Sequence, residues 1–394
     1  MKKVVLAYSG GLDTTYCLKY LGIEKGYEIH TVLVNTGGFS KEELEVVTAK
    51  AQEMGSVEHV NLDITQEYYD KAIKFMVYGN VLKNNTYPLS VSAERVFQSI
   101  AIIEYAKEVG ADAVAHGSTG AGNDQIRFDM IFQTLAPGIE IITPIRDMKL
   151  TREEEISYLK EKGVDLAWEK AQYSINKGIW GTSVGGAETL TSHKALPDSA
   201  YPSQLTKTEP DTISIEFEKG QITGVNGETF SSLDAILKVE ELTSAYAIGR
   251  DIHVGDTIIG IKGRVGFEAA AAITIIKAHQ ALEKHTLSKW QQYHKAQLGD
   301  FYGMLLHEGQ YLDPIMRDIE AFLESSQKSV TGSVELTLMP YTFQINGIKS
   351  SFDLMSNEFG DYGEVNKLWN SEEAKGFIKI LSTSNKIYHS VNKK

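Results

Sequence analysis

The sequence predicts an α/β protein with a doubly wound, mostly parallel sheet, followed by an α+β domain and a C-terminal helix. Up to about residue 163, apolar strand-like runs alternate with helical segments, which is typical of a parallel sheet. Further on, runs turn at Lys219-Gly220 and Asn226-Gly227, which favours antiparallel hairpins. Because 394 residues exceed one ordinary core, we place the domains at 1–165, 166–365 and 366–394.

Residues 3–15 open the first domain with a strand, a glycine turn and a helix. Val4 to Ala7 is a short apolar run of the kind that a buried parallel strand needs. Ser9 to Gly11 permits a tight turn, and Asp13 to Thr15 supplies capping residues. Free N–H groups and the positive end of the helix dipole then face one pocket, which predicts a phosphate site. An ordinary strand–turn–helix is the weaker alternative.

The first domain continues this alternation. Strands are expected at 30–34, 57–62, 113–115 and 139–145. Helices are expected at 40–54 and 65–78, near 92, from 123, and from 151 to near 163. Ser40 is the expected N-cap of its helix, and Thr151 to Glu154 is a capping box. The carboxyl ends of these strands are expected to gather ligands, which makes Val34 a candidate contact for adenine or ribose.

Two loops ahead of helices predict substrate contacts. The loop at 79–91 can place Tyr87, Ser92 and Arg95 in a cleft, although each alone is more often a surface or capping residue. The second loop follows His116-Gly117 and leads to Asn123, Asp124 and Arg127. Amide, carboxylate and guanidinium together suit an amino acid, which carries both charge signs. The alternative is a capped helix with a surface ion pair of little energetic weight.

The second half is expected to begin with a long ordered crossing over 164–212. Strands are then expected at 212–217, 258–265, 334–339 and 341–345, and helices at 232–242, 268–287 and through most of 288–328. An amphipathic tail helix from Ser371 carries an apolar stripe that must be buried, and a neighbouring subunit is a reasonable partner.

Composition narrows the function classes. A net charge of −13 argues against nucleic acid or an anionic membrane as a partner. The single cysteine, Cys17, cannot form an internal disulfide and is expected to pack in the first helix. With no signal peptide and no run long enough to span a bilayer, we expect a cytoplasmic protein.

The motifs together resemble the argininosuccinate synthase family over nearly the whole chain, and Ser9 to Thr15 resembles the PP-loop of N-type ATP pyrophosphatases. The resemblance is carried by residues 7–15, 115–128, 173–174, 180–183, 258–264 and 376–379. It implies a ligase that uses ATP and Mg²⁺ to join citrulline and aspartate through a citrullyl-adenylate, releasing AMP and pyrophosphate. It also implies a synthetase and multimerisation domain and a homotetramer.

Carried over residue by residue, the resemblance implies three groups of contacts. ATP would be bound by Ala7, Tyr8, Ser9, Gly10, Gly11, Leu12, Asp13, Thr14, Thr15, Val34 and Gly117. Aspartate would be bound by Thr119, Asn123 and Asp124. Citrulline would be bound by Tyr87, Ser92, Asn123, Arg127, Ser174 and Ser183. Mg²⁺ would neutralise the pyrophosphate, and no protein side chain is assigned to it.

Gly255 and Phe267 depart from the family pattern, which has a glutamate and a tyrosine beside citrulline. Val34 likewise replaces an expected alanine. Losing the carboxylate partner of a buried ammonium costs about a few kcal/mol. One interpretation is an N-acylated citrulline, with Gly255 making room. The preferred one is that another carboxylate holds the ammonium: Asp251, Asp256 or Glu188.

Two other functions compete. A different PP-loop ligase acting on GMP, NAD or tRNA would be expected to carry a glutaminase half, a Cys-x-x-Cys pair or a basic surface. A non-enzymatic nucleotide-binding protein would not need the amino-acid group at Asn123, Asp124 and Arg127.

Overall fold

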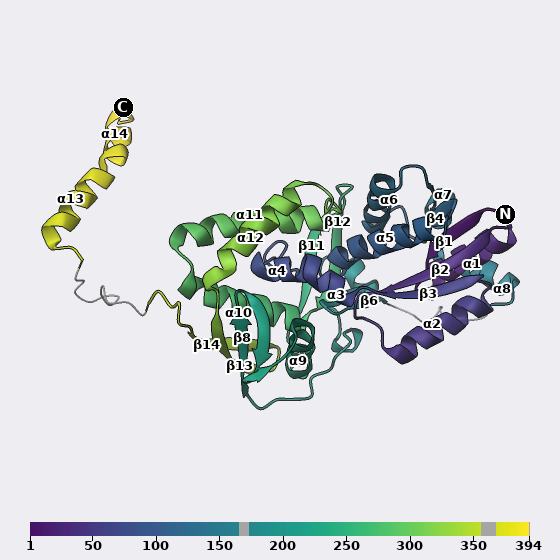
Figure 1. Cartoon of the computed structure of the whole chain (residues 1–394), viewed down its shortest axis with the longest axis horizontal. Helices are drawn as coiled ribbons and strands as arrows, with labels where there is room; N and C mark the ends of the chain where they lie inside the picture. Colours follow the sequence, from purple (N-terminus) through teal and green to yellow (C-terminus); the bar gives the residue numbers. More distant parts are fainter. Residues whose placement is uncertain (165–172, 356–367, 394) are drawn as a thin grey trace.

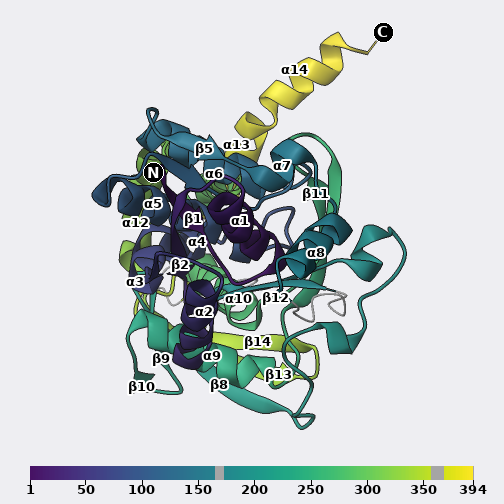
Figure 2. The same cartoon turned by 90° about the vertical axis from the view of Figure 1, so that its right-hand side faces the viewer.

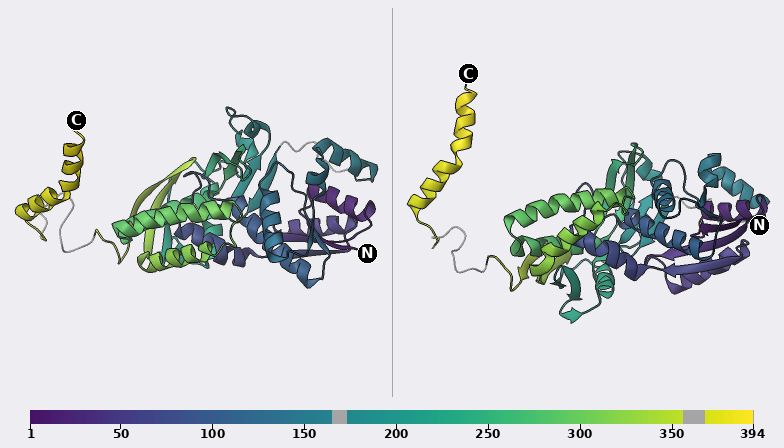
Figure 3. Two further views of the ribbon diagram at one scale, coloured as in Figure 1. Left: turned by 90° about the horizontal axis from the view of Figure 1, so that it is seen from above. Right: turned by 45° about the horizontal axis from the view of Figure 1, so that its top comes forward.

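The computed structural model describes residues 1–164, 173–355 and 368–393. Figure 1 shows the N-terminal sheet at one end of an elongated body, with the second domain beside it. The helices α13 (Ser371–Leu381) and α14 (Thr383–Val391) stand apart from this body in both views of Figure 3. The tail helix expected from Ser371 is therefore two consecutive helices.

The first sheet is parallel, with strand order β3-β2-β1-β4-β5. Its strands are β1 (Lys3–Ala7), β2 (Glu28–Asn35), β3 (Glu58–Asp63), β4 (Ala113–Ala115) and β5 (Glu140–Ile142). Its helices are α1 (Leu12–Ile23), α2 (Lys41–Glu53), α3 (Thr65–Tyr68), a π-helical turn (Tyr69–Ile73), α4 (Lys74–Tyr78), α5 (Ser90–Glu108), α6 (Asp124–Leu135), α7 (Pro144–Met148) and α8 (Arg152–Glu161). The doubly wound prediction is confirmed.

The central strand β1 is buried on both faces. Val4 and Leu6 pack with side chains of α1, α2 and α8, whereas Val5 packs in the cluster that contains α5 and α6. This alternation follows from the two-residue repeat of a strand covered by helices on both sides. Cys17 of α1 is fully buried in the first of these clusters, as expected. Strand order reverses at β1, between β2 and β4, which is where an open α/β sheet gathers ligands.

The second domain contains two antiparallel sheets. One has the order β11-β12-β7-β6 and the other β10-β9-β8-β13-β14. The strands are β6 (Ser174–Gly178), β7 (Gly181–Gly185), β8 (Asp211–Glu218), β9 (Gln221–Val225), β10 (Glu228–Thr229), β11 (Arg250–Asp256), β12 (Lys262–Glu268), β13 (Gly332–Met339) and β14 (Thr342–Lys349). The helices are α9 (Ser232–Ser244), α10 (Ala270–Thr286), α11 (Lys289–His307) and α12 (Ile315–Ser326), and short 3-10 turns lie at Ala187–Leu190, Asp198–Ala200 and Gln327–Ser329.

Several element predictions were wrong. The crossing over 164–212 contains the hairpin β6–β7, and 165–172 lie outside the described residues. The strand expected at 139–145 ends early because Pro144 begins α7, a position where proline suits a helix. The strand expected at 258–265 begins only at Lys262, because Ile258 to Ile261 form the tip of the hairpin β11–β12. Strand β11 was missed altogether.

The alanine run of α10 serves packing within the chain. Ala270, Ala271 and Ala272 are all buried. The N–H of Ala271 donates to Glu240 Oε2 of α9 at 2.8 Å. Small side chains therefore let the start of α10 approach α9 closely.

Candidate ATP and amino-acid site

The phosphate loop lies between β1 and α1 at the point where strand order reverses. Gly10 adopts φ +74°, a left-handed conformation that favours glycine. The first hydrogen bond within α1 runs from Thr15 N to Gly11 O at 3.0 Å, so the N–H groups of residues 12–14 precede the helical ladder. Gly11 is the N-cap and makes no side-chain cap, so the expectation that residues 13–15 cap this helix was wrong.

The hydroxyl groups of the loop bind its own backbone. Ser9 Oγ accepts from Gly11 N at 3.4 Å, and Thr14 Oγ1 accepts from Ser9 N at the same distance. Tyr8, Leu12 and Thr15 have buried side chains, so these three residues can offer a ligand their backbone groups only. The loop therefore presents N–H groups and the exposed hydroxyl of Ser9, which suits phosphate oxygens.

A lysine that the sequence analysis missed reaches the same loop. Lys50 of α2 donates from Nζ to the carbonyl oxygen of Gly10 at 2.5 Å. Burial lowers the pKa of this ammonium, and the nearby Glu53 opposes that shift. The contact joins residues 40 positions apart, so no local motif could have indicated it.

The loop after β4 packs directly against the phosphate loop. A carbon atom added at Gly117 would lie 3.1 Å from both the carbonyl carbon and the Cβ of Asp13, so a side chain there would crowd Asp13. The neighbouring His116 is buried and pairs through Nε2 with Asp129 at 2.8 Å. Val34 lies near the carboxyl end of β2, and its carbonyl oxygen accepts a hydrogen bond from Gln98 Nε2. Thr119 lies exposed in the loop that leads to α6.

Asp124 stands between two arginines at the start of α6. Arg127 Nη1 lies 2.8 Å from Asp124 Oδ1, and Arg95 Nε lies 3.2 Å from Oδ2. Burial opposes ionisation of this carboxyl, but the charges of the two arginines outweigh it and lower its pKa. Arg127 also donates from Nε to the His307 carbonyl at 2.9 Å. The structure therefore brings Asp124 and Arg127 together and adds Arg95 to them, while their role as an amino-acid site stays a prediction.

Asn123 connects this group to the second domain. Its Oδ1 accepts from the N–H of Ile258 at 2.9 Å. Ile258 belongs to the tip of the hairpin β11–β12, so Asn123 fixes this tip beside α6.

The residues expected around citrulline come from three segments. Tyr87 is buried, lies 5.3 Å from the Phe267 ring and stacks on His253 at 5.2 Å. Phe267 pairs in register with Ser183 of β7. Ser92 is buried at the start of α5, and within the described part of the chain its Oγ has no hydrogen-bond partner. These residues are brought together at the boundary between the domains.

The hairpin β6–β7 reaches the arginine group. Asn176 pairs in register with Ser183 and accepts from Arg95 Nη2 at 2.7 Å. Ser174, two residues earlier, is exposed and shares a strand face with Asn176. Both serines assigned to citrulline therefore lie on a hairpin that contacts Arg95.

The space beside Gly255 is already filled. A carbon atom added there would lie 2.7 Å from His253 Nε2, so the imidazole stands where a side chain at this position would project. Two carboxylates considered as replacements have other partners. Asp256 pairs with Lys262 at 2.7 Å, and Glu188 accepts from the Tyr173 hydroxyl at 2.8 Å. Asp251 is exposed and accepts from a backbone N–H of its own strand.

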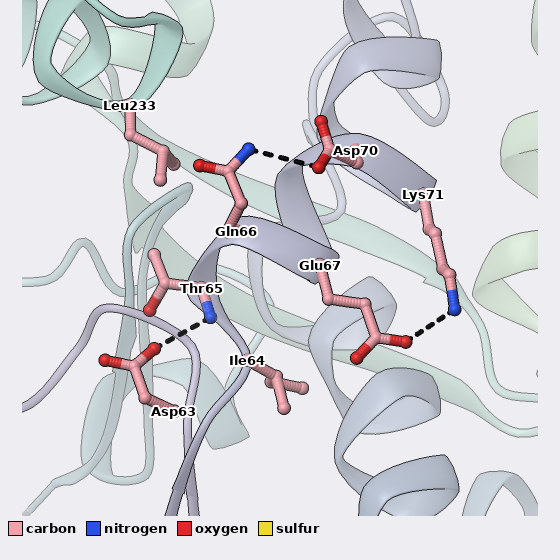
Figure 4. A pocket seen from close by; sticks show the side chains of 8 residues that line it. All are labelled: Asp63, Ile64, Thr65, Gln66, Glu67, Asp70, Lys71 and Leu233. Atoms are coloured by element: carbon pink, nitrogen blue, oxygen red, sulfur yellow. Dashed lines mark hydrogen bonds and ion pairs between the residues drawn. The ribbon is translucent and has the colours of Figure 1, made fainter.

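A separate surface hollow of about 700 Å³ lies beside α3 (Figure 4). Its charged and amide groups satisfy one another, since Lys71 pairs with Glu67 at 2.6 Å and Gln66 donates to Asp70 at 3.1 Å. None of the predicted site residues lines it.

Comparison with known proteins shows the family of this chain. Residues 3–165 match a family model described as "Arginosuccinate synthase N-terminal HUP domain", and residues 173–388 match "Arginosuccinate synthase C-terminal domain". The chain belongs to the argininosuccinate synthase family. This family of ligases catalyses the ATP-dependent joining of citrulline and aspartate in arginine biosynthesis.

Relatives align over almost their whole length. Argininosuccinate synthase from Methanocaldococcus jannaschii is 36% identical over 387 residues, which cover 98% of this chain and 97% of the relative. The enzymes from Xanthomonas campestris pv. campestris and Dictyoglomus thermophilum are each 35% identical and cover 97% or more of both chains. These findings do not favour another PP-loop ligase, a non-enzymatic nucleotide-binding protein or an N-acylated substrate.

Proposed function

We propose that ATP binds where the β1 and β4 loops meet, with its phosphates on the N–H groups at the start of α1. The observation that supports this most is the close packing of Gly117 on Asp13 at the reversal of strand order. The adenosine would lie toward Val34, and Lys50 would add positive charge behind the loop. The remaining ATP contacts are those assigned from sequence.

Aspartate would bind at Thr119, Asn123 and Asp124, and citrulline at Tyr87, Ser92, Asn123, Arg127, Ser174 and Ser183. Arg95 and Arg127 share Asp124, which holds the three side chains rigid before either substrate arrives. In the reaction, the ureido oxygen of citrulline would attack the α-phosphorus and expel pyrophosphate, forming citrullyl-adenylate. The aspartate amine would then attack the ureido carbon, lose a proton and release AMP. The protein orients the reactants and stabilises charge on the phosphates.

We infer that Mg²⁺ enters with ATP. Within residues 1–164, 173–355 and 368–393, no group of three or more His, Cys, Asp or Glu side chains is arranged to hold a metal. Phosphate oxygens are ordinary Mg²⁺ ligands, and the bound ion would neutralise the pyrophosphate.

Pyrophosphate release from ATP and Mg²⁺ tests the activity. Release should require citrulline, and argininosuccinate should form only when aspartate is also present; no release with any of these mixtures would overturn the proposal. For the site, Ser183→Ala should raise the KM for citrulline while leaving the KM for ATP unchanged. Ser192→Ala, on an exposed loop, is the matched control.

We also propose a cytoplasmic homotetramer assembled through the tail. Phe377, Ile380, Leu381, Ile387 and Tyr388 are each at least 59% exposed, so nothing among residues 1–164, 173–355 and 368–393 covers the stripe. No helix in the described part of the chain is long and apolar enough to cross a bilayer. Deleting residues 368–394 should convert the assembly to species with fewer subunits in analytical ultracentrifugation. If the truncated protein keeps the same number of subunits, the tail is not the assembly element.

A further inference from the structure

A buried carboxyl group with no role in the assignments above lies directly behind the phosphate loop. Glu155 of α8 is only 3% exposed. Its carboxyl faces that of Asp13 in the first turn of α1, close enough for the two to share a hydrogen bond. Such a bond requires a proton on one of the two groups, because two ionised carboxylates provide no donor.

The position of Glu155 is fixed by the packing of α8 on α1, which Figure 2 shows side by side. The rings of Tyr158 and Tyr16 lie 4.9 Å apart, and Lys162 pairs with Glu24 at 2.7 Å. Glu155 precedes Tyr158 by three residues, so both side chains share the helix face that meets α1.

Asp13 also packs against the loop after β4. Gly117 packs against its backbone and Cβ, as described above. Asp13 therefore meets the β4 loop through its backbone and Cβ, and Glu155 through its carboxyl. Within the described residues, no nitrogen or hydroxyl donates to Glu155 Oε2.

Burial raises the pKa of Glu155 to about 8, and the charge of Asp13 reinforces this shift while Arg152 opposes it. Burial also raises the pKa of Asp13. The other titratable groups that face the pair are Tyr16 and Cys17 of α1. At neutral pH, Glu155 therefore keeps its proton and is the donor.

We propose that Glu155 is a positioning residue for the ATP loop, whose neutral carboxyl donates to Asp13 and holds the first turn of α1 in its phosphate-binding arrangement. The proposal rests on the ATP site proposed above. When Glu155 ionises, the hydrogen bond is lost and a second negative charge arises behind the triphosphate. ATP binding should therefore weaken as the pH rises through about 8.

Calorimetric titration of the full-length protein with a non-hydrolysable ATP analogue at pH 7 and pH 9 tests this. The wild type should bind about tenfold more weakly at pH 9, the ratio expected for a lost hydrogen bond to a charged group. Glu155→Gln should bind equally at both pH values, because an amide donates at either. Glu155→Leu should bind about tenfold more weakly than wild type at pH 7. Glu153→Gln, on the exposed face of α8, should follow the wild type.

Thermal unfolding of each variant establishes whether it is folded. If Glu155→Leu does not fold, Glu155→Gln, which has nearly the same shape as the wild-type side chain, still tests the proposal. The proposal is wrong if Glu155→Gln keeps the pH dependence of the wild type. It is also wrong if a folded Glu155→Leu binds as tightly as wild type at pH 7. Gly117→Ala distinguishes a failure of this proposal from a failure of the proposed ATP site, because the added methyl group crowds Asp13 without changing Glu155. If that variant also binds the analogue normally, the ATP site itself is misassigned.

Discussion

Replacing Gly38 with alanine should separate the nucleotide half of the site from the citrulline half. Gly38 follows β2, and a carbon atom added there would lie 2.0 Å from the Lys177 carbonyl oxygen and 3.1 Å from Gly178 N. Both are backbone atoms of the hairpin β6–β7, so no side-chain rotation can relieve the clash. The hairpin must move by about 1 Å, since carbon and oxygen atoms in contact stand well over 3 Å apart.

The cost follows from what this movement breaks. Ile179 N donates to Thr36 O at 3.1 Å, and this is the backbone bond that docks the hairpin on the loop after β2. Overpacking costs about 1–3 kcal/mol, and a lost hydrogen bond adds about 1 kcal/mol, so unfolding should become easier by about 2–4 kcal/mol. Because Ser174 and Ser183 lie on the moved hairpin, the KM for citrulline should rise more than the KM for ATP.

Urea unfolding and steady-state kinetics measure both effects. Gly22→Ala is the matched control, since nothing lies within 4 Å of a carbon atom added there and the site is inside α1. Alanine favours a helix over glycine by up to about 1 kcal/mol, so this control should be neutral or more stable. If Gly38→Ala unfolds with the wild-type free energy, the hairpin is not fixed by this contact and the reasoning fails.

Two further predictions concern charged side chains. Asp124→Asn leaves Arg95 and Arg127 without their shared carboxylate. Because Asp124 is 38% exposed, solvent screening limits the loss of folding stability to about 1–2 kcal/mol, which urea unfolding would measure. The KM for aspartate should rise in steady-state kinetics. Burial raises the pKa of Glu94 to about 7, although Arg95 and Thr36 oppose the shift. Between about pH 4.5 and 7, the folded state therefore binds one more proton at Glu94 than the unfolded state does. The free energy of unfolding of the wild type should fall as the pH rises through this range. Glu94→Gln should flatten that part of the stability curve; an unchanged slope in unfolding measured across this range would contradict the assignment.

The sequence predicted those features that depend on neighbours along the chain. The strand, glycine turn and helix at 3–15 form one local unit, and Ser40 and Thr151 open their helices with capping boxes as expected. Asp124 and Arg127 are three residues apart on one helix, so their pairing follows from helical spacing alone.

The missed features depend on contacts between distant segments. Lys50 and Glu155 join the site only after α2 and α8 pack on the sheet. The hairpin β6–β7 was read as a loop because its glycines and serines have low strand propensity. Its register is set by pairing with β12, which follows about 80 residues later.

At Gly255, where the family pattern has a glutamate, the imidazole of His253 stands in the adjacent space but does not supply the missing negative charge. His253, two residues earlier on the same strand face, places its imidazole in the space next to Gly255 and stacks on Tyr87. Burial lowers the pKa of His253, and the charge of Lys83 adds to this, so the ring is neutral at pH 7. An imidazole here therefore supports Tyr87 without supplying an anion. A substrate ammonium at this wall must find its partner elsewhere. Asp124, which is 38% exposed although its two oxygens serve two arginines, and the exposed Asp251 are carboxylates in the described part of the site that remain open to a ligand.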